Sequence, residues 1–286
     1  MKAKNLKTNI QFKCPEFWLL ATAVGCIAIH LTLVWKVDSS NLLSISLLFW
    51  ASVSCLIWER RTSLYLHSGI ISSLVGLLIL ILLLVKVASM SVYGNFLCFL
   101  PPLFGISLAL LSSGFQGLKQ YRKEFLVLFA FCIISILPGI STDISPLTAK
   151  FAAFVLWYSG SEVVRSGENI YLQTGSVEVY QGCSGIELIC QMLGIGILFL
   201  SLFPLKLWQK ILVPTVSAII GFIVNGMRVV LMANLVASNQ KELFDYWHVG
   251  DGSLIFSFIA VLILGLLCWF ILRQNQLMHP NKRSLK

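Results

Sequence analysis

Long apolar stretches recur along almost the whole chain, and they limit what it can fold into. A transmembrane helix needs about 20 mostly apolar residues, and eight stretches approach or exceed that length. Soluble domains carry about 25% charged residues, whereas this 286-residue chain has 12% charged and 57% hydrophobic residues. A soluble or disordered protein is therefore excluded, and we predict an all-α polytopic membrane protein. The predicted spans are about Phe17–Val37, Leu42–Trp58, Leu66–Val85, Val92–Leu111, Phe125–Ile140, Ser184–Phe203, Ile211–Val236 and His248–Leu272.

A ninth apolar segment, Leu147–Val164, is weaker than these eight. Lys150, Glu162 and Arg165 lie within it or beside it. We therefore predict an amphipathic or re-entrant segment instead of a full crossing.

The distribution of the basic residues predicts the orientation of the spans. The net charge is +9, with 21 lysines and arginines. With both termini in the cytoplasm, most of these residues lie on the cytoplasmic side, as the positive-inside rule requires. A ninth crossing would destroy this asymmetry. Because the basic residues are spread over several loops and both tails, they give no indication of nucleic-acid binding.

The longest polar stretch between spans, Glu168–Gly182, has the pattern of a short β-hairpin. Apolar residues alternate with polar ones on both sides of Thr174–Gly175, which predicts two strands joined by a glycine-bearing turn. The predicted orientation puts this hairpin on the outer face, directly before the sixth span. The alternating residues are Ile170, Leu172, Val177 and Val179.

Cys183 follows the hairpin at the start of the sixth span. Ser184 and Glu187 have the spacing of a capping box, so we predict that Ser184 is the N-cap of this helix. A thiol near a helix amino terminus favours its thiolate form. The alternative is a small buried hydrophobic residue, which suits the other seven cysteines, because nearly all lie in apolar runs and do not form a disulfide framework.

Arg228 lies inside the seventh span, where an arginine costs about 2.5 to 3.5 kcal/mol. It should therefore face the bundle interior or a hydrated cavity, with Asn225 one turn earlier on the same face. The 18 residues from Lys210 rise about 27 Å, which puts Arg228 close to the outer edge of the membrane core. The alternative is a side chain that extends to the lipid headgroups.

His248 opens the predicted last span, again on the outer face. It lies in the segment Tyr246–Gly252, beside aromatic residues. An interfacial histidine in an aromatic belt is the alternative interpretation. Taken together, the three spans bring a thiol, a guanidinium and an imidazole to one face. A thiolate can attack a carbonyl, an imidazole can carry the proton and a cation can stabilise the oxyanion. This set predicts acyl transfer through a thioester.

The same residues resemble a known family. Cys183-Ser184-Gly185-Ile186 after a short hairpin, Asn225-x-x-Arg228 in the next span and His248 before the last one are similar to the exosortase/archaeosortase family. The turn at Arg60–Arg61, the chain length and the first helices look most like the cyanobacterial exosortases of the cyanoexosortase A type.

This resemblance implies an extracytoplasmic cysteine transpeptidase of the cytoplasmic membrane. Its partners would be exported proteins that end in a Pro-Glu-Pro-like motif, a hydrophobic helix and a basic cluster, and its acceptor an amine or a lipid. It implies that Cys183 is the nucleophile, Arg228 the electrostatic stabiliser and His248 the proton carrier. Neither a cofactor nor a metal is implied. We expect four further residues near the substrate, namely Ser184, Glu187, Asn225 and Asp251.

The resemblance also divides the chain into three parts. Residues 1–124 form an amino-terminal membrane region of four helices, residues 125–272 the catalytic membrane core and residues 273–286 a basic cytoplasmic tail. The competing hypothesis is a transporter or channel whose polar path is lined by Arg228, Glu187 and His248. Against it, these residues gather at one membrane face, and no inverted repeat is visible.

Overall fold

The computed structural model describes residues 15–37, 40–140, 143–248, 250 and 252–278. The chain divides into two compact units, Met1–Cys132 and Ile133–Lys286. The first unit holds four complete helices, a short 3-10 helix and the beginning of α5. Their bounds are α1 (Pro15–Lys36), α2 (Ser40–Glu59), α3 (Ile70–Ser89), α4 (Phe96–Gly117), η1 (Leu118–Tyr121) and α5 (Arg122–Ile140).

Small residues let the helices of the first unit approach closely. A Cβ atom at Gly76 of α3 would lie 2.9 Å from the backbone oxygen of Ser107 on α4. The Ser107 hydroxyl donates a hydrogen bond of 2.8 Å to the Gly76 carbonyl. Small residues and serine hydroxyls pack membrane helices in this way. The close approach thus explains why α3 and α4 are tightly paired.

The predicted spans correspond to helices of the structure. Among the described residues, seven stretches are long and apolar enough to cross a membrane. One of them, Phe96–Ile140, has 45 residues and would measure about 68 Å as a single helix, more than twice the membrane core. Gly114, with φ 64°, and η1 interrupt it. It therefore contains two helices, α4 and α5, and each of the eight predicted spans overlaps one long helix of the described residues.

The described residues of the second unit contain the end of α5, a small sheet, five further α-helices and the 3-10 helix η2. The helices are α6 (Ser145–Tyr158), η2 (Gln181–Cys183), α7 (Ile186–Leu202), α8 (Leu207–Ala237), α9 (Lys241–His248) and α10 (Gly252–Met278); the strands are β1 (Val163–Ser166), β2 (Asn169–Leu172) and β3 (Gly175–Glu178).

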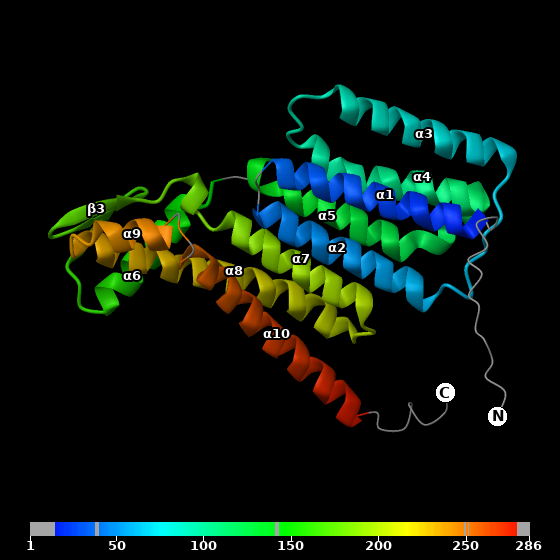
Figure 1. Ribbon diagram of the computed structural model, residues 1–286. Helices are drawn as coiled ribbons and strands as arrows, with labels where there is room; N and C mark the ends of the chain where they lie inside the picture. The colour runs from blue at the N-terminus through cyan, green and yellow to red at the C-terminus, as the bar shows by residue number, and fades with distance from the viewer. Residues whose placement is uncertain (1–14, 38–39, 141–142, 249, 251, 279–286) are drawn as a thin grey trace, which may run out of the picture. The chain divides into compact units, whose positions relative to one another are not determined.

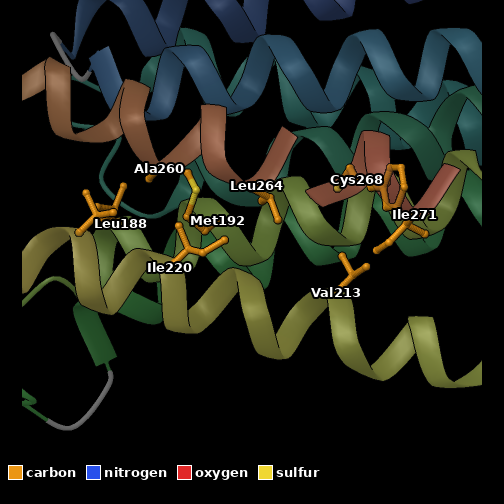
Figure 2. Close-up of a cluster of buried hydrophobic side chains, with 10 residues drawn as sticks. Leu188, Met192, Val213, Ile220, Ala260, Leu264, Cys268 and Ile271 are labelled. Carbon is orange, nitrogen blue, oxygen red and sulfur yellow. The ribbon is translucent and has the colours of Figure 1, made fainter. Parts of the chain in front are cut away.

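A hydrophobic core joins α7, α8 and α10. Figure 2 shows side chains of the three helices directed toward one another, among them Met192 of α7, Ile220 of α8 and Leu264 of α10. Met192 and Leu264 are almost completely buried. This apolar packing fixes the ends of the three helices, which carry or adjoin the polar residues of interest.

The helix α6 accounts for most of the ninth apolar segment. Its 14 residues rise only about 21 Å, too little for a crossing of about 30 Å. Ala149, Ala152 and Leu156 are buried on one side, whereas Phe154 and Trp157 are exposed on the other. The segment therefore does not cross as one helix, its amphipathic or re-entrant character stays a prediction, and its last two residues begin the unpredicted strand β1.

The predicted hairpin is confirmed as β2 and β3, which pair antiparallel with Ile170 opposite Val177. The strand β1 extends it to a three-stranded sheet in the order β1-β2-β3. Ile170 and Val179 are buried and pack with Ala149 and Val230 of the neighbouring helices. The sheet, α6 and α9 therefore gather at the carboxyl-terminal end of α8 (Figure 1).

Candidate active site

The hairpin delivers Cys183 to the start of α7 through the single turn η2. The Cys183 amide donates a hydrogen bond of 2.8 Å to the Tyr180 carbonyl. Asn225 of α8 donates through its side-chain nitrogen to the Cys183 carbonyl at 2.9 Å. Thr148 of α6 donates to the Ser184 carbonyl at 2.6 Å. Two helices thus hold the backbone carbonyls of Cys183 and of the residue after it.

The predicted N-cap at Ser184 is wrong. The N-cap of α7 is Gly185, with φ 94°, and the structure assigns it no side-chain cap. Ser184 is buried, and its hydroxyl donates instead to the Gln181 carbonyl at 2.6 Å. The η2 turn moves the N-cap from Ser184 to Gly185. The chain leaves this turn through a residue in the left-handed conformation before α7 begins, and glycine adopts that conformation without strain.

His248 lies next to the thiol. Its Nε2 atom is 3.5 Å from the Cys183 Sγ atom, a distance at which a thiol and a ring nitrogen can exchange a proton. The imidazole lies against the Phe244 ring, with centroids 5.0 Å apart, and edge-on to the Tyr180 ring at 6.4 Å. Aromatic contacts on two sides restrict the orientation of the ring.

The prediction that His248 opens the last span is also wrong. His248 ends the short helix α9, and α10 begins at Gly252. The reason is local: a Cβ atom at Gly250 would lie 2.7 Å from the Tyr246 carbonyl. The Gly250 amide donates to the Asp245 carbonyl at 3.1 Å, which closes the end of α9. The histidine is therefore placed by a separate helix and not by the span.

Arg228 contacts the same segment from α8. Its Nη2 atom donates to the His248 carbonyl at 2.7 Å. Its Nε atom is buried and has no hydrogen-bond partner within the part of the chain that the structure describes. Asn225 and Arg228 lie on one face of α8, as predicted; Asn225 donates to the Cys183 carbonyl and Arg228 to the His248 carbonyl. The guanidinium thus binds a backbone carbonyl of the protein, as expected for a side chain that faces the interior and does not extend to the lipid headgroups.

Burial and the nearby Arg228 cation favour the neutral form of His248. Burial lowers the pKa of His248 below the ordinary 6.5, and the Arg228 cation lowers it further, whereas Asp245 acts in the opposite direction. A neutral imidazole can accept a proton from a thiol at neutral pH. The site therefore holds a base in the protonation state that attack by a thiol requires.

Only two of the four residues that were predicted to lie near the substrate are found in the site. Ser184 and Asn225 lie in the site, whereas Glu187 is exposed in the first turn of α7. Asp251 lies outside the described residues. Tyr180, Thr148 and Asp245 contact or influence the site but were not predicted. For Tyr180, its position three residues before the cysteine at the end of the hairpin was a usable signal.

No metal centre is apparent in residues 15–37, 40–140, 143–248, 250 and 252–278, where no three His, Cys, Asp or Glu side chains gather at ligand distances. What the fold and site define is a polytopic membrane protein. At one end of a helix group it carries a thiol, a neutral imidazole and a fixed guanidinium.

Comparison with known proteins gives the family. Residues 35–265 match the family model described as Transmembrane exosortase (Exosortase_EpsH). This match covers most of the chain, which therefore belongs to the transmembrane exosortase family. Its members are proteases or transpeptidases that act on substrates with C-terminal sorting signals.

A curated relative, the "Probable archaeosortase E" of Methanocaldococcus jannaschii, is 29% identical over 98 residues. Those residues are 34% of this chain and 50% of the relative, so the chain spans about half the length of this curated protein. No solved structure matches the chain. The predicted exosortase/archaeosortase membership is confirmed, and the cyanobacterial type stays a prediction.

Proposed function

We propose that the protein is a cysteine transpeptidase that cleaves Pro-Glu-Pro-type C-terminal sorting signals of exported proteins and transfers the chains to an acceptor. The observation that carries the proposal is the distance of 3.5 Å between Cys183 Sγ and His248 Nε2. Membership of the exosortase family supports the same reaction class.

The first half of the reaction forms a thioester. With its hydrogen on Nδ1, the neutral His248 ring accepts the Cys183 proton on Nε2 while the sulfur attacks the scissile carbonyl. The tetrahedral intermediate then expels the amine of the sorting tail, which takes the proton from His248. The acyl group remains on Cys183 as a thioester, and the hydrophobic tail is released into the membrane.

The second half passes the acyl group to an acceptor. An amine or lipid nucleophile gives its proton to His248 and attacks the thioester carbonyl, and the sulfur leaves. Arg228 supports both halves in two ways. Its positive charge stabilises the negative charge that develops on the carbonyl oxygen. Its hydrogen bond to the His248 carbonyl holds the segment that carries the base in place.

The charge distribution and the family support a proposed location. We assign the protein to the cytoplasmic membrane, with both termini in the cytoplasm and the site on the outer face, because the basic residues are asymmetric. Within the family we assign it to the cyanobacterial type on the strength of the Arg60–Arg61 turn and the first helices.

Substitution of the nucleophile tests the proposal. We expect Cys183→Ala to abolish processing of a tagged, co-expressed substrate while the variant still accumulates in the membrane. Cys55→Ala is the matched control, since Cys55 is an exposed cysteine of α2, and it should process normally. Mass spectrometry of the new C-terminus identifies the cleaved bond and any attached acceptor. Normal processing by Cys183→Ala overturns the proposal, and solute flux lost only in Arg228→Ala would favour a transporter.

A further inference from the structure

The strand β3 is an edge strand, because the order of the sheet is β1-β2-β3. The Val179 amide, directly after β3, donates a hydrogen bond of 3.0 Å to the Glu168 carbonyl and therefore points toward the β2 side. Backbone groups alternate in direction along an antiparallel strand, so those of Ser176 and Glu178 point away from β2. Within the described part of the chain, no other element bonds to them. The outer edge of β3 thus presents free backbone donors and acceptors.

This outer edge leads to the candidate active site. Tyr180 still has the extended backbone of a strand, with φ -81° and ψ 170°. By the same alternation its carbonyl points to the outer side, and there it accepts the hydrogen bond of 2.8 Å from the Cys183 amide. The turn that carries the thiol therefore lies on the outer side of β3, in line with the free backbone groups of Ser176 and Glu178.

The strand is held in place by the helices beneath it. Val179 is buried and Val177 partly buried, and both pack in the core that joins the sheet to α6 and α8. At the start of β3, the Thr174 hydroxyl donates to the Ala237 carbonyl at the end of α8. Ser176 and Glu178, in contrast, are exposed. The edge is thus formed before a partner binds, which lowers the entropic cost of binding.

The open edge also limits the kind of partner. Open sheet edges do not occur in contact with the hydrocarbon of a membrane, so the sheet must lie in the aqueous phase. The edge therefore fits a water-exposed chain and not the hydrophobic helix of a sorting signal. In the proposed reaction, that chain is the exported part of the substrate, directly before the scissile bond. Extended peptides bind exposed sheet edges through main-chain hydrogen bonds.

From this geometry we propose that the outer edge of β3 is the docking strand for the substrate. The extended segment before the scissile bond adds to the sheet through the backbone of Ser176 and Glu178, and this pairing directs the scissile carbonyl to Cys183. Main-chain pairing leaves alternate side chains of the substrate free of the edge, so one strand can receive different exported proteins. The inference rests on the proposed function, but its test measures binding without turnover.

The test uses purified full-length Cys183→Ala protein in detergent. The probe is a fluorescein-labelled synthetic peptide that contains a Pro-Glu-Pro-type segment and the residues before it, without the hydrophobic helix. Fluorescence anisotropy gives its Kd. Proline has no N–H group, so adding Glu178→Pro removes one outward donor and no hydrogen bond to β2. We expect Kd to rise about tenfold, as for the loss of one hydrogen bond that leaves its acceptor unpaired.

Two control variants in the same Cys183→Ala background make the result specific. Glu178→Ala removes the same side chain but keeps the backbone donor, and it should bind with the Kd of the parent protein. Arg165→Pro changes the opposite edge of the sheet. Arg165 pairs with Ile170, whose backbone groups point toward β3, so the backbone of Arg165 also points away from β2. Arg165→Pro should likewise leave Kd unchanged.

A set of modified peptides tests the same pairing from the substrate side and does not depend on how the sheet tolerates proline. In each peptide, an ester replaces the backbone amide of one residue other than proline. Groups that face β3 recur at every second position of an extended chain. We therefore expect every second ester to raise Kd for Cys183→Ala by about three- to tenfold.

The outcomes separate this inference from the proposed function. No binding of the peptide, equal Kd with and without Glu178→Pro, or no alternation among the esters overturns the docking strand, even where Cys183→Ala abolishes processing. An equal loss in Glu178→Ala or Arg165→Pro overturns it as well. The expected binding pattern together with normal processing by Cys183→Ala supports the docking strand and overturns the proposed function. A dimer that Glu178→Pro dissociates, measured by light scattering, would mean that a second copy occupies the edge, and it overturns the inference.

Discussion

Arg228 has two separable effects, and two substitutions distinguish them. Its Nη2 atom holds the His248 carbonyl at 2.7 Å, and its charge lowers the pKa of His248. Lysine keeps the charge but has no planar fork of donors. Arg228→Lys therefore tests the geometry, whereas Arg228→Gln removes the charge as well.

The first effect is the loss of the hydrogen bond from Arg228 to the His248 carbonyl. A hydrogen bond from a charged donor contributes about 1.5 to 3 kcal/mol, and about 1.4 kcal/mol corresponds to tenfold in rate. We expect Arg228→Lys to lower kcat/KM for a fluorogenic sorting-signal peptide by roughly 10- to 100-fold. The acid limb of its pH profile should stay in place, because the charge beside His248 is retained.

The second effect is the change in the pKa of His248 when the charge of Arg228 is removed, and its direction can be predicted. The proposed reaction needs neutral His248, so we expect activity to fall as the pH drops through the pKa of His248, which lies below 6.5 in the intact site. Arg228→Gln removes the cation that lowers this pKa. The acid limb of kcat/KM should consequently move to higher pH, in addition to the loss of rate.

A matched arginine provides the control. Arg165 on β1 also donates to a backbone carbonyl, that of Gly167, at 2.6 Å, but it is exposed. Arg165→Lys should leave both the rate and the pH profile unchanged. Wild-type kcat/KM in Arg228→Lys would refute the positioning role, and an unmoved acid limb in Arg228→Gln would refute the electrostatic one.

Two further predictions address the neighbours of these residues. Because Asp245 raises the pKa of His248, Asp245→Asn should move the acid limb of kcat/KM to lower pH; a limb that moves upward would contradict this assignment. Gly185→Ala should destabilise the protein by about 2 kcal/mol, since Gly185 has φ 94° and an added Cβ would lie 2.6 Å from the Asn225 side chain. Thermal unfolding in detergent measures this loss, with Gly265→Ala as control because nothing lies within 4 Å of its Cβ position.

The sequence was sufficient for the membrane helices and for the hairpin. Span length and hydrophobicity are properties of many residues at once, so an error at one position does not alter the result. The alternation around Thr174–Gly175 likewise predicted β2 and β3. In contrast, β1 begins with Val163 and Val164, two adjacent apolar residues that end an apolar segment. Its first residues therefore show no alternation that would separate a strand from that segment.

Single-residue geometry was harder to predict. The capping-box spacing of Ser184 and Glu187 predicted a helix start one residue too early, because the η2 turn is invisible to that pattern. His248 was assigned to the apolar run after it, because hydrophobicity does not reveal the break between the end of α9 at His248 and the start of α10 at Gly252. Tyr180 was missed because its backbone hydrogen bond with Cys183 depends on a turn that brings residues three apart together. Each miss is a local backbone reversal.

The motif Asn225-x-x-Arg228 was predicted, yet its physical meaning became clear only from its partners. Residues three apart on a helix share one face and are separated by about 4.5 Å along the axis. Asn225 holds the Cys183 carbonyl, and Arg228 holds the His248 carbonyl. One turn of α8 thus sets the separation between the nucleophile segment and the base segment. The acceptors are backbone atoms, which no residue pattern displays, so a search for charged or polar side-chain partners could not have found them. We therefore expect the proposed catalysis to depend on the spacing of the motif as well as on the charge that Arg228 carries.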